Sequence, residues 1–533
     1  MGAMGSNIRL LDCTLRDGGY VNDWNFGNST ITGIFDRLNE AHVDIIEIGF
    51  LDDRNPEDIN RSIQPNTQAI AKTFSNTIKP TSMVVAMIDY GTCDIKNVQP
   101  CKDTILDGIR VIFKKENMYK AADFGKQLMD LGYKVFLQLV SITDYEEQDI
   151  RDFCEYVNKI GPHAISIVDT YGLMHKPQAT NYFILLNKYL NKDIAIGYHS
   201  HNNFQLAYTN TVEILDLGID RDIVLDGSLY GMGKSAGNAP LELIAMNLNQ
   251  RFGKKYDIDQ ILTAIDVNIM PIYAKHYWGY NLLFYIAAMN DCHPTYVKYL
   301  LDRHTLSVKD VNTILQKIEL ERKLRYKEEY IESLYERYIL NGINDVEYVE
   351  ALSQTLKDRK VLLIGPGNSI VAREKEIKDY ISSENPLAIG VNFVPDNIPV
   401  GFVFLSRPSR YDQALPKLKD SDVKVIATTN ITSVGKPFEY PVRYDALIEN
   451  TEWDNALAIL LTLLEKIGLK DVALAGFDGF KKNVDDNYIS TDFDLSKRYD
   501  YLSELNRCMT KKIKACRKTM NIKFLTESLY EAN

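Results

Sequence analysis

IRLLDC, at residues 8–13, is the first of eight apolar runs that alternate with helical patterns through the first half of the chain. Each run is short and contains β-branched residues, which is typical of strands buried on both faces of a parallel sheet. The other runs occupy residues 43–49, 83–88, 109–113, 135–140, 164–168, 194–198 and 223–225. The sequence therefore predicts eight parallel strands in this half.

The segments between these runs carry the spacing of amphipathic helices. Apolar residues recur at i, i+3, i+4 and i+7 from Ile31, and again from Ile150. Eight strands that each precede a helix, over roughly 250 residues, predict a (β/α)8 TIM barrel, and the strand count favours it over a doubly wound open sheet. In such barrels the active site lies just beyond the carboxyl ends of the strands.

The second half of the chain changes pattern twice. Residues 266–355 lack strand runs and predict helices over 273–301 and 308–340, the second containing the charged stretch ELERKLRYKEE as a solvated face. A new α/β pattern begins at Arg359, and a helical tail from Leu495 ends in the basic stretch MTKKIKACRK. Its predicted strands cover residues 361–364, 388–394, 400–405, 423–427 and 472–475. We expect an expression scar at 1–6, a barrel domain at 7–265, a helical extension at 266–355 and a second α/β domain at 356–533.

Composition excludes several classes of protein. The 61 basic and 72 acidic side chains give a net charge of −11, which argues against a general nucleic-acid binder. The longest apolar stretches, residues 282–289 and 456–464, are well short of the roughly 20 residues of a membrane helix. Seven scattered cysteines without a CxxC pair fit reduced thiols. We therefore expect a soluble cytoplasmic protein with no nucleic-acid or membrane partner.

Two histidines in IAIGYHSHNN, residues 194–203, give the strongest chemical signal. The period of two along a strand places His199 and His201 on the same face, at the carboxyl end of the seventh predicted strand. Two neutral imidazoles so close together can clamp a divalent metal, although such pairs are also ordinary polar ends of strands. The position in a barrel favours the metal.

The stretch LLDCTLRDGGY, residues 10–20, gives the second signal. Arg16 and Asp17 are adjacent charged residues that follow the first buried strand. They fit either a surface salt bridge or a site in which Asp17 is an oxygen ligand beside the two histidines. Only the eighth strand separates the first from the seventh in a closed barrel, so these three side chains can converge. Asp17, His199 and His201 are therefore the predicted metal ligands.

Further polar residues follow other predicted strands. We expect Glu47 to pair with Arg16 and orient it, and Asp169 and Thr170, after the sixth strand, to contact substrate. The loop GMGKSAGN, residues 231–238, either binds phosphate through its amides or is a flexible turn.

Together, LLDCTLRDGG, IEIGF, HSHNN and GMGKSAGN resemble the DRE-TIM metallolyase superfamily, and in particular 4-hydroxy-2-oxovalerate aldolase-like proteins, over residues 7–340. The resemblance implies that Asp17, His199 and His201 hold Mn²⁺ or Mg²⁺, and that the metal and Arg16 bind a 2-oxo acid such as pyruvate. This fits the chemistry, because an aldol reaction of pyruvate passes through an enolate that a metal and a guanidinium stabilise.

The sequence also departs from this family. The aldolases carry a histidine base shortly after the Arg-Asp pair, where this chain has Tyr20, so Tyr20, Tyr280 in WGYN or a metal-bound water is the expected acid/base. The hydroxymethylglutaryl-CoA lyase branch has a cysteine in its glycine loop, and GMGKSAGN has none, although Asn238 in that loop is expected near the substrate. His276 and His293 are predicted to be packing or capping residues.

The second α/β domain carries a weaker signal. The run KVLLIGPGNSI places a glycine turn between a strand and a helix, where amides favour phosphate, and the candidate loop residues are Gly365, Gly367, Asn368 and Ser369. With ALAGFDGF, residues 473–480, this turn loosely resembles Rossmann-like domains of surface-glycan and nucleotide-sugar enzymes. A packing or dimerisation domain is the alternative.

The resemblance and the residues together predict a class II, pyruvate-type, metal-dependent aldolase, a carbon–carbon lyase that joins or cleaves a pyruvate-type enolate and an aldehyde. A sugar-like or nucleotide-linked aldehyde, a role in surface-glycan or sugar biosynthesis and a homodimer or higher homo-oligomer are further expectations. An acyl-CoA-dependent Claisen condensing enzyme and a non-catalytic barrel scaffold remain the alternatives.

Overall fold

The computed structural model describes residues 8–302, 306–323, 325–340, 344–435, 437–448, 455–482, 487–490 and 499–531. The chain forms two compact units, one of residues 1–297 with 321–326 and one of residues 298–320 with 327–533, and each is described by itself. No helix among the described residues combines the length and the apolar character needed to cross a membrane. All seven cysteines are free thiols.

The first unit is a closed parallel barrel. Its strand order is β1-β9-β8-β7-β6-β5-β4-β2, and pairing of β1 with β2 closes the circle. The eight barrel strands are β1 (Ile8–Asp12), β2 (Ile45–Leu51), β4 (Met83–Asp89), β5 (Gly108–Phe113), β6 (Lys134–Leu139), β7 (Ala164–Asp169), β8 (Ala195–Ser200) and β9 (Ile223–Gly227). The predicted TIM barrel is therefore confirmed, with strand limits within two residues of those expected. A two-residue strand that the sequence did not predict, β3 (Ile63–Gln64), pairs in parallel with the end of β2.

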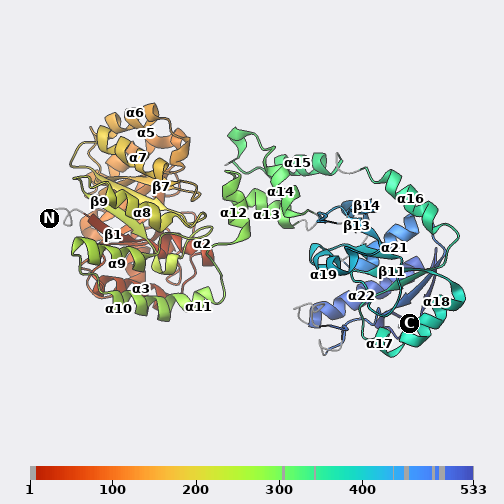
Figure 1. The fold of residues 1–533 in the computed structure, drawn as a ribbon. Coiled ribbons are helices and arrows are strands. Elements are labelled where there is room, and N and C mark those ends of the chain that lie inside the picture. Colours follow the sequence, from red (N-terminus) through yellow and green to blue (C-terminus); the bar gives the residue numbers. More distant parts are fainter. Residues whose placement is uncertain are drawn as a thin grey trace. The chain divides into compact units, whose positions relative to one another are not determined.

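Helices surround the barrel and bury its outer face (Figure 1). Their apolar stripes pack on the strands; in α3, for example, Ile31, Ile34, Phe35 and Leu38 are all buried. The interior is filled at one level by apolar side chains from the strands, including Leu11, Phe136 and Val224. The helices are α3 (Asn28–Glu40), α4 (Thr67–Thr73), α5 (Met118–Asp130), α6 (Glu147–Val157), α7 (Lys176–Tyr189), α8 (Ala207–Asp216), α9 (Leu241–Phe252) and α10 (Ile258–Ala264).

Two long helices predicted after the barrel are each interrupted. The first is divided into α11 (Met270–Tyr273), α12 (Leu282–Met289) and α13 (Pro294–Asp302), because Asn281 caps α12 and Asp291, with a φ of +51°, precedes Pro294, which begins a new helix. The second is divided into α14 (Val308–Leu315) and α15 (Glu328–Leu340).

The charged stretch 319–329 was predicted wrongly as a helix interior. Most of it lies between α14 and α15, where the carbonyls of Arg322 and Arg325 accept hydrogen bonds from the hydroxyl of Tyr296, and that of Lys323 accepts one from the amide of His293. Tertiary contacts therefore use carbonyls that a continuous helix would need. The domain limits at residues 265 and 355 stay a prediction.

The second unit contains an open, fully parallel sheet in the order β14-β13-β12-β11-β10-β15-β16. Its strands are β10 (Val361–Ile364), β11 (Leu387–Val391), β12 (Phe402–Leu405), β13 (Lys424–Thr428), β14 (Tyr440–Val442), β15 (Asp471–Ala475) and β16 (Asn521–Phe524). The sequence missed β14 and β16, which are short strands at the two edges. The predicted helical tail ends at Cys516, and the chain then returns to the sheet as β16.

Helices cover both faces of this sheet. Val361 and Leu363 of β10 pack with the helices of one face, whereas Leu362 and Ile364 pack with those of the other. The first face carries α16 (Val346–Leu356), α20 (Tyr444–Ile448), α21 (Ala456–Lys466) and α22 (Tyr499–Cys516). The second carries α17 (Ser369–Ala372), α18 (Glu374–Glu384) and α19 (Pro408–Leu418). The strands β10, β11 and β12 are apolar along their whole length because both of their faces are buried.

Candidate metal centre

Three predicted side chains meet at the carboxyl end of the barrel strands. Asp17 ends α1 (Thr14–Asp17), the single helical turn after β1; His199 lies near the end of β8, and His201 directly follows it. All three are buried, and one ligand atom of each lies within 4.8 Å of the others. They converge because β9 alone separates β1 from β8.

The carboxylate of Asp17 is held in its charged form. Its Oδ1 accepts a hydrogen bond of 2.6 Å from Arg16 Nη1, and its Oδ2 accepts bonds from Asn238 Nδ2 at 2.9 Å and the Lys234 amide at 3.1 Å. Burial raises the pKa of Asp17, but the charge of Arg16 and the hydrogen bond from Asn238 help to outweigh it, and the pKa lies well below its ordinary value. The group is a charged oxygen donor at neutral pH.

Both imidazoles are suited to bind a cation. His199 Nδ1 lies 3.0 Å from Asp226 Oδ2, and this contact leaves Nε2 for a metal. Burial lowers the pKa of His201 to about 3, so its ring is neutral. Its Nδ1 is buried 3.9 Å from Asp17 Oδ2 and has no hydrogen-bond partner among the described residues. One carboxylate and two imidazoles fit a divalent transition metal.

A chain of buried ion pairs connects the ligands from behind. Arg16 Nε and Arg110 Nη1 both donate to Glu47 Oε2 at 2.9 Å, and Arg110 Nη2 donates to Asp226 Oδ2 at 2.5 Å. Burial alone would lower the pKa of Arg16, but Glu47 and Asp17 raise it above its ordinary value. The contact expected between Glu47 and Arg16 is present. Arg110 and Asp226 were missed, although a charge inside an apolar barrel strand was a visible signal.

The loop 231–238 closes on the ligands. Its Asn238 forms an antiparallel bridge with His201, and a Cβ on Gly233 would lie only 2.6 Å from Asp17 Oδ2. Lys234, another residue that the sequence reasoning missed, places its Nζ 5.3 Å from the centre of the Tyr20 ring. The glycine at 233 therefore permits the close approach of the loop to Asp17.

The two tyrosines expected as acid/base residues lie in different surroundings. The ring of Tyr20 packs edge-on against Trp24, and burial together with Asp17 raises the pKa of Tyr20 to about 12. Tyr280 is half exposed and packs against Tyr285. Of the two, only Tyr20 interacts with the charges of the candidate centre.

The expected substrate contacts Asp169 and Thr170 are engaged within the barrel rim. The Asp169 carboxylate accepts bonds from the amides of Leu173 and Met174, and burial raises its pKa to about 6. Thr170 Oγ1 accepts a bond of 2.8 Å from the Ser141 amide. These two side chains therefore shape the loops after β7.

The two histidines beyond the barrel differ in their surroundings. His276 is exposed. His293 Nδ1 accepts a bond of 3.2 Å from the Thr295 amide at the start of α13, as a capping residue would, and its ring packs edge-on against Tyr171. Burial and the charge of Lys234 lower the pKa of His293.

The glycine turn of the second unit is paired within the protein. The amides of Gly365 and Gly367 donate to the carbonyls of Ala475 and Gly476, and the Ser369 amide donates to Asp478 Oδ2 at 2.9 Å. A Cβ on Gly365 would lie 2.5 Å from the Gly476 carbonyl oxygen. These glycines allow two chain segments to touch, and Asn368 precedes the short helix α17. Three amides of the predicted phosphate loop thus already donate hydrogen bonds within the protein.

Comparison with known proteins identifies the barrel. Residues 7–268 match the protein-family model HMGL-like. The chain is 27% identical to an oxaloacetate decarboxylase of Mycobacterium tuberculosis over 262 residues (48% of this chain, 74% of the relative), and 25% identical to a 4-hydroxy-2-oxovalerate aldolase of Geobacillus genomosp. 3 over 273 residues (50% and 77%). The crystal structure of the N-terminal domain of a candidate aldolase from Bacteroides vulgatus aligns with 24% identity and a TM-score of 0.47, covering 56% of this chain and 98% of that domain. The barrel of this chain is therefore similar to the HMGL-like family over residues 7–268.

Proposed function

We propose that the barrel is a divalent-metal-dependent carbon–carbon lyase acting on a 2-oxo acid through a pyruvate-type enolate. The observation that carries the proposal is the buried cluster of Asp17, His199 and His201 with Arg16 beside it. A metal bound there would act as a Lewis acid toward the 2-oxo acid. The names of the relatives, a decarboxylase and aldolases, fit this chemistry.

The chain's own residues support the reaction in two ways. Arg16 Nε and Nη1 bind Glu47 and Asp17, so the guanidinium is fixed in one orientation and directs its remaining Nη2 donors to an anionic oxygen. Because the site is buried, this charge acts at low dielectric and needs no reorganisation when negative charge develops.

A decarboxylase is the second candidate, and Tyr20 favours it. Aldol cleavage needs a base for the hydroxyl of the substrate, and a tyrosine whose pKa is raised to about 12 remains protonated at neutral pH. Loss of CO₂ from a 2-oxo acid needs no such base, only a proton donor to the resulting enolate. A protonated Tyr20 could supply that proton in either reaction.

The deciding experiment measures exchange of the methyl protons of pyruvate with D₂O by NMR, with Mn²⁺ or Mg²⁺ present. We expect the wild type to catalyse this exchange and the His199→Ala/His201→Ala variant not to catalyse it. Exchange that survives in this variant, once its fold is verified by circular dichroism, would refute the proposal. Release of CO₂ from oxaloacetate or of pyruvate from 4-hydroxy-2-oxo acids then separates the two candidates.

Two alternative functions have distinct signatures. A Claisen condensing enzyme would release a free thiol from acetyl-CoA. A scaffold barrel would contain no metal by elemental analysis of the purified protein. The identity of the aldehyde, including a sugar-like or nucleotide-linked one, belongs to the same proposal and is tested by a panel of aldehydes with pyruvate.

A further inference from the structure

The second unit contains a pocket that is open to solvent. It is lined by residues that directly follow β10, β11, β12 and β15, so it lies at the carboxyl edge of the parallel sheet. Strands β11 to β14 extend from β10 in one direction, and β15 and β16 extend in the other. In open parallel sheets this reversal of strand order is where ligands bind.

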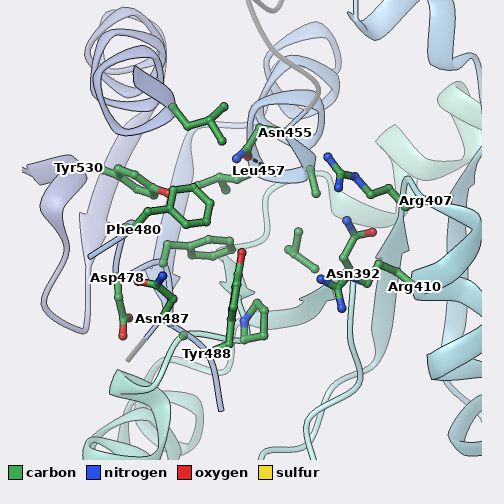
Figure 2. A pocket seen from close by; sticks show the side chains of 18 residues that line it. Asn392, Arg407, Arg410, Asn455, Leu457, Asp478, Phe480, Asn487, Tyr488 and Tyr530 are labelled. Carbon is green, nitrogen blue, oxygen red and sulfur yellow. Dashed lines mark hydrogen bonds between the residues drawn. The ribbon is translucent and has the colours of Figure 1, made fainter. Parts of the chain in front are cut away.

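The two sides of the pocket differ in chemistry (Figure 2). Arg407 and Arg410 lie on one side, and Phe480, Tyr488 and Tyr530 lie on the opposite side. A guanidinium offers planar, paired donors that match the oxygens of a phosphate. Aromatic rings stack on a flat ring. The pocket therefore combines a face for an anion with a face for a ring.

The positive character of the arginine side is reinforced by helix ends. Arg407 and Arg410 flank the start of α19, and Asn455 and Leu457 flank the start of α21. Both helices have 11 residues, and the amino terminus of a helix favours negative charge. Among the described lining residues the one acid is Asp478, whose carboxylate binds Ser369 at the start of α17.

The walls are held by hydrogen bonds to the backbone. Asn392, with a φ of +57°, accepts a bond of 2.9 Å from the Ser406 amide, which fixes it beside the arginines. Phe480 is bound through both its amide and its carbonyl by the Asn506 side chain at 2.8 Å. A non-glycine residue at positive φ is uncommon and is retained where surrounding contacts determine it. The pocket is thus preformed.

We infer that this pocket binds a nucleoside phosphate, with the base stacked on the aromatic side and the phosphate held by Arg407 and Arg410. The phosphate contacts come from these arginines and not from the glycine turn, whose amides are paired within the protein. All lining residues belong to the second unit, so this site is separate from the metal centre of the barrel.

The test is calorimetric titration of the full chain with ADP and UDP, and with adenosine, uridine and inorganic phosphate. We expect at least one nucleotide to bind at least tenfold more tightly than its nucleoside and than phosphate. Arg407→Gln and Arg410→Gln should each weaken binding about tenfold, because each removes a charged pair of donors. Arg373→Gln removes an exposed arginine of the same unit that does not line the pocket and should leave binding unchanged.

Three results would overturn the inference. They are no binding of either nucleotide at millimolar concentration, phosphate binding as tightly as the nucleotide, and equal binding by the wild type and the Arg407→Gln/Arg410→Gln variant. Hydrogen–deuterium exchange of the wild type gives a measurement that requires no variant. Bound nucleotide should protect residues 405–411 and 476–480, and protection confined to the barrel would contradict the proposed site.

Discussion

Arg110 and Asp226 form an ion pair of 2.5 Å inside the barrel, where both side chains are 1% exposed. Burying two charges costs several kcal/mol of desolvation each, so such a pair is retained only with further hydrogen bonds. Here Arg110 also binds Glu47, and Asp226 also binds His199. The pair therefore joins His199, a proposed metal ligand, to Glu47 and through it to Arg16, which binds Asp17.

Replacing Asp226 with asparagine should weaken metal binding. The variant keeps the shape of the side chain but removes the charge that orients His199 through Nδ1. We expect Mn²⁺ affinity to fall about 10- to 100-fold, the usual effect of losing such a partner, as measured by calorimetry. Asp222→Asn, which alters a half-exposed acid next to the same strand, is the control. Equal affinities in the two variants would show that Asp226 does not orient the ligand.

Replacing Arg110 with methionine should destabilise the barrel. It leaves Glu47 with one arginine fewer and Asp226 without its arginine, inside a site closed to water. The free energy of unfolding should fall by about 3–5 kcal/mol, measured by urea denaturation. Arg151→Met removes an exposed arginine paired with Glu155 and should leave the free energy of unfolding nearly unchanged. A loss below 1 kcal/mol for Arg110 would contradict this expectation.

Replacing Gly233 with alanine should disturb the metal centre specifically. The new Cβ would overlap Asp17 Oδ2 and the Asn238 amide group, so the loop must move away from Asp17. Mn²⁺ affinity should fall at least tenfold, while the thermal unfolding midpoint of the metal-free protein shifts little. Gly401→Ala is matched to it, because a Cβ there meets nothing within 4 Å. Undiminished Mn²⁺ binding would mean that the loop tolerates the displacement.

The stability of the barrel should depend on the protonation of His163. Burial, then the charges of Arg9 and Lys134, lower its pKa to about 4 from an ordinary value of 6.5. The unfolded chain therefore binds this proton more readily than the folded one, so stability is complete above pH 6.5 and is lost as the pH falls toward 4. Between pH 7 and pH 4.5 this group should lower the free energy of unfolding of the wild type by on the order of 1–2 kcal/mol, after allowance for solvent screening. The His163→Gln variant should not show this part of the decrease.

Urea denaturation of the two proteins at pH 7 and pH 4.5 measures this difference. His276→Gln changes an exposed histidine and serves as the control. We expect its stability to depend on pH as that of the wild type does. If His163→Gln also keeps the pH dependence of the wild type, another group is responsible.

The sequence predicted the barrel well because of where its strands lie. A strand buried on both faces must be apolar along its whole length, so β7 and β8 are visible as runs without any three-dimensional information. Asp17, His199 and His201 were predictable for a related reason. Once the strand order is known, residues at the carboxyl ends of β1 and β8 must lie close together.

The missed features depend on partners that are distant in sequence. Arg110 and Asp226 are 116 positions apart, and neither charge makes sense in an apolar strand until the barrel brings them together. The interruption before Pro294 could have been predicted from proline chemistry, whereas the carbonyls of Arg322 and Arg325 are bound by a tyrosine that only the tertiary structure brings there. The edge strands β14 and β16 are short, and β16 is exposed at alternate residues.

The ion pairs behind the candidate metal centre also bear on the order of binding. Three carboxylates, those of Asp17, Glu47 and Asp226, face the two guanidinium groups of Arg16 and Arg110, and the ammonium of Lys234 also interacts with Asp17. These positive groups are thus already matched by carboxylates, and the proposed divalent cation would supply the excess positive charge that an anionic substrate needs. The proposed function therefore predicts that the cation binds before the substrate.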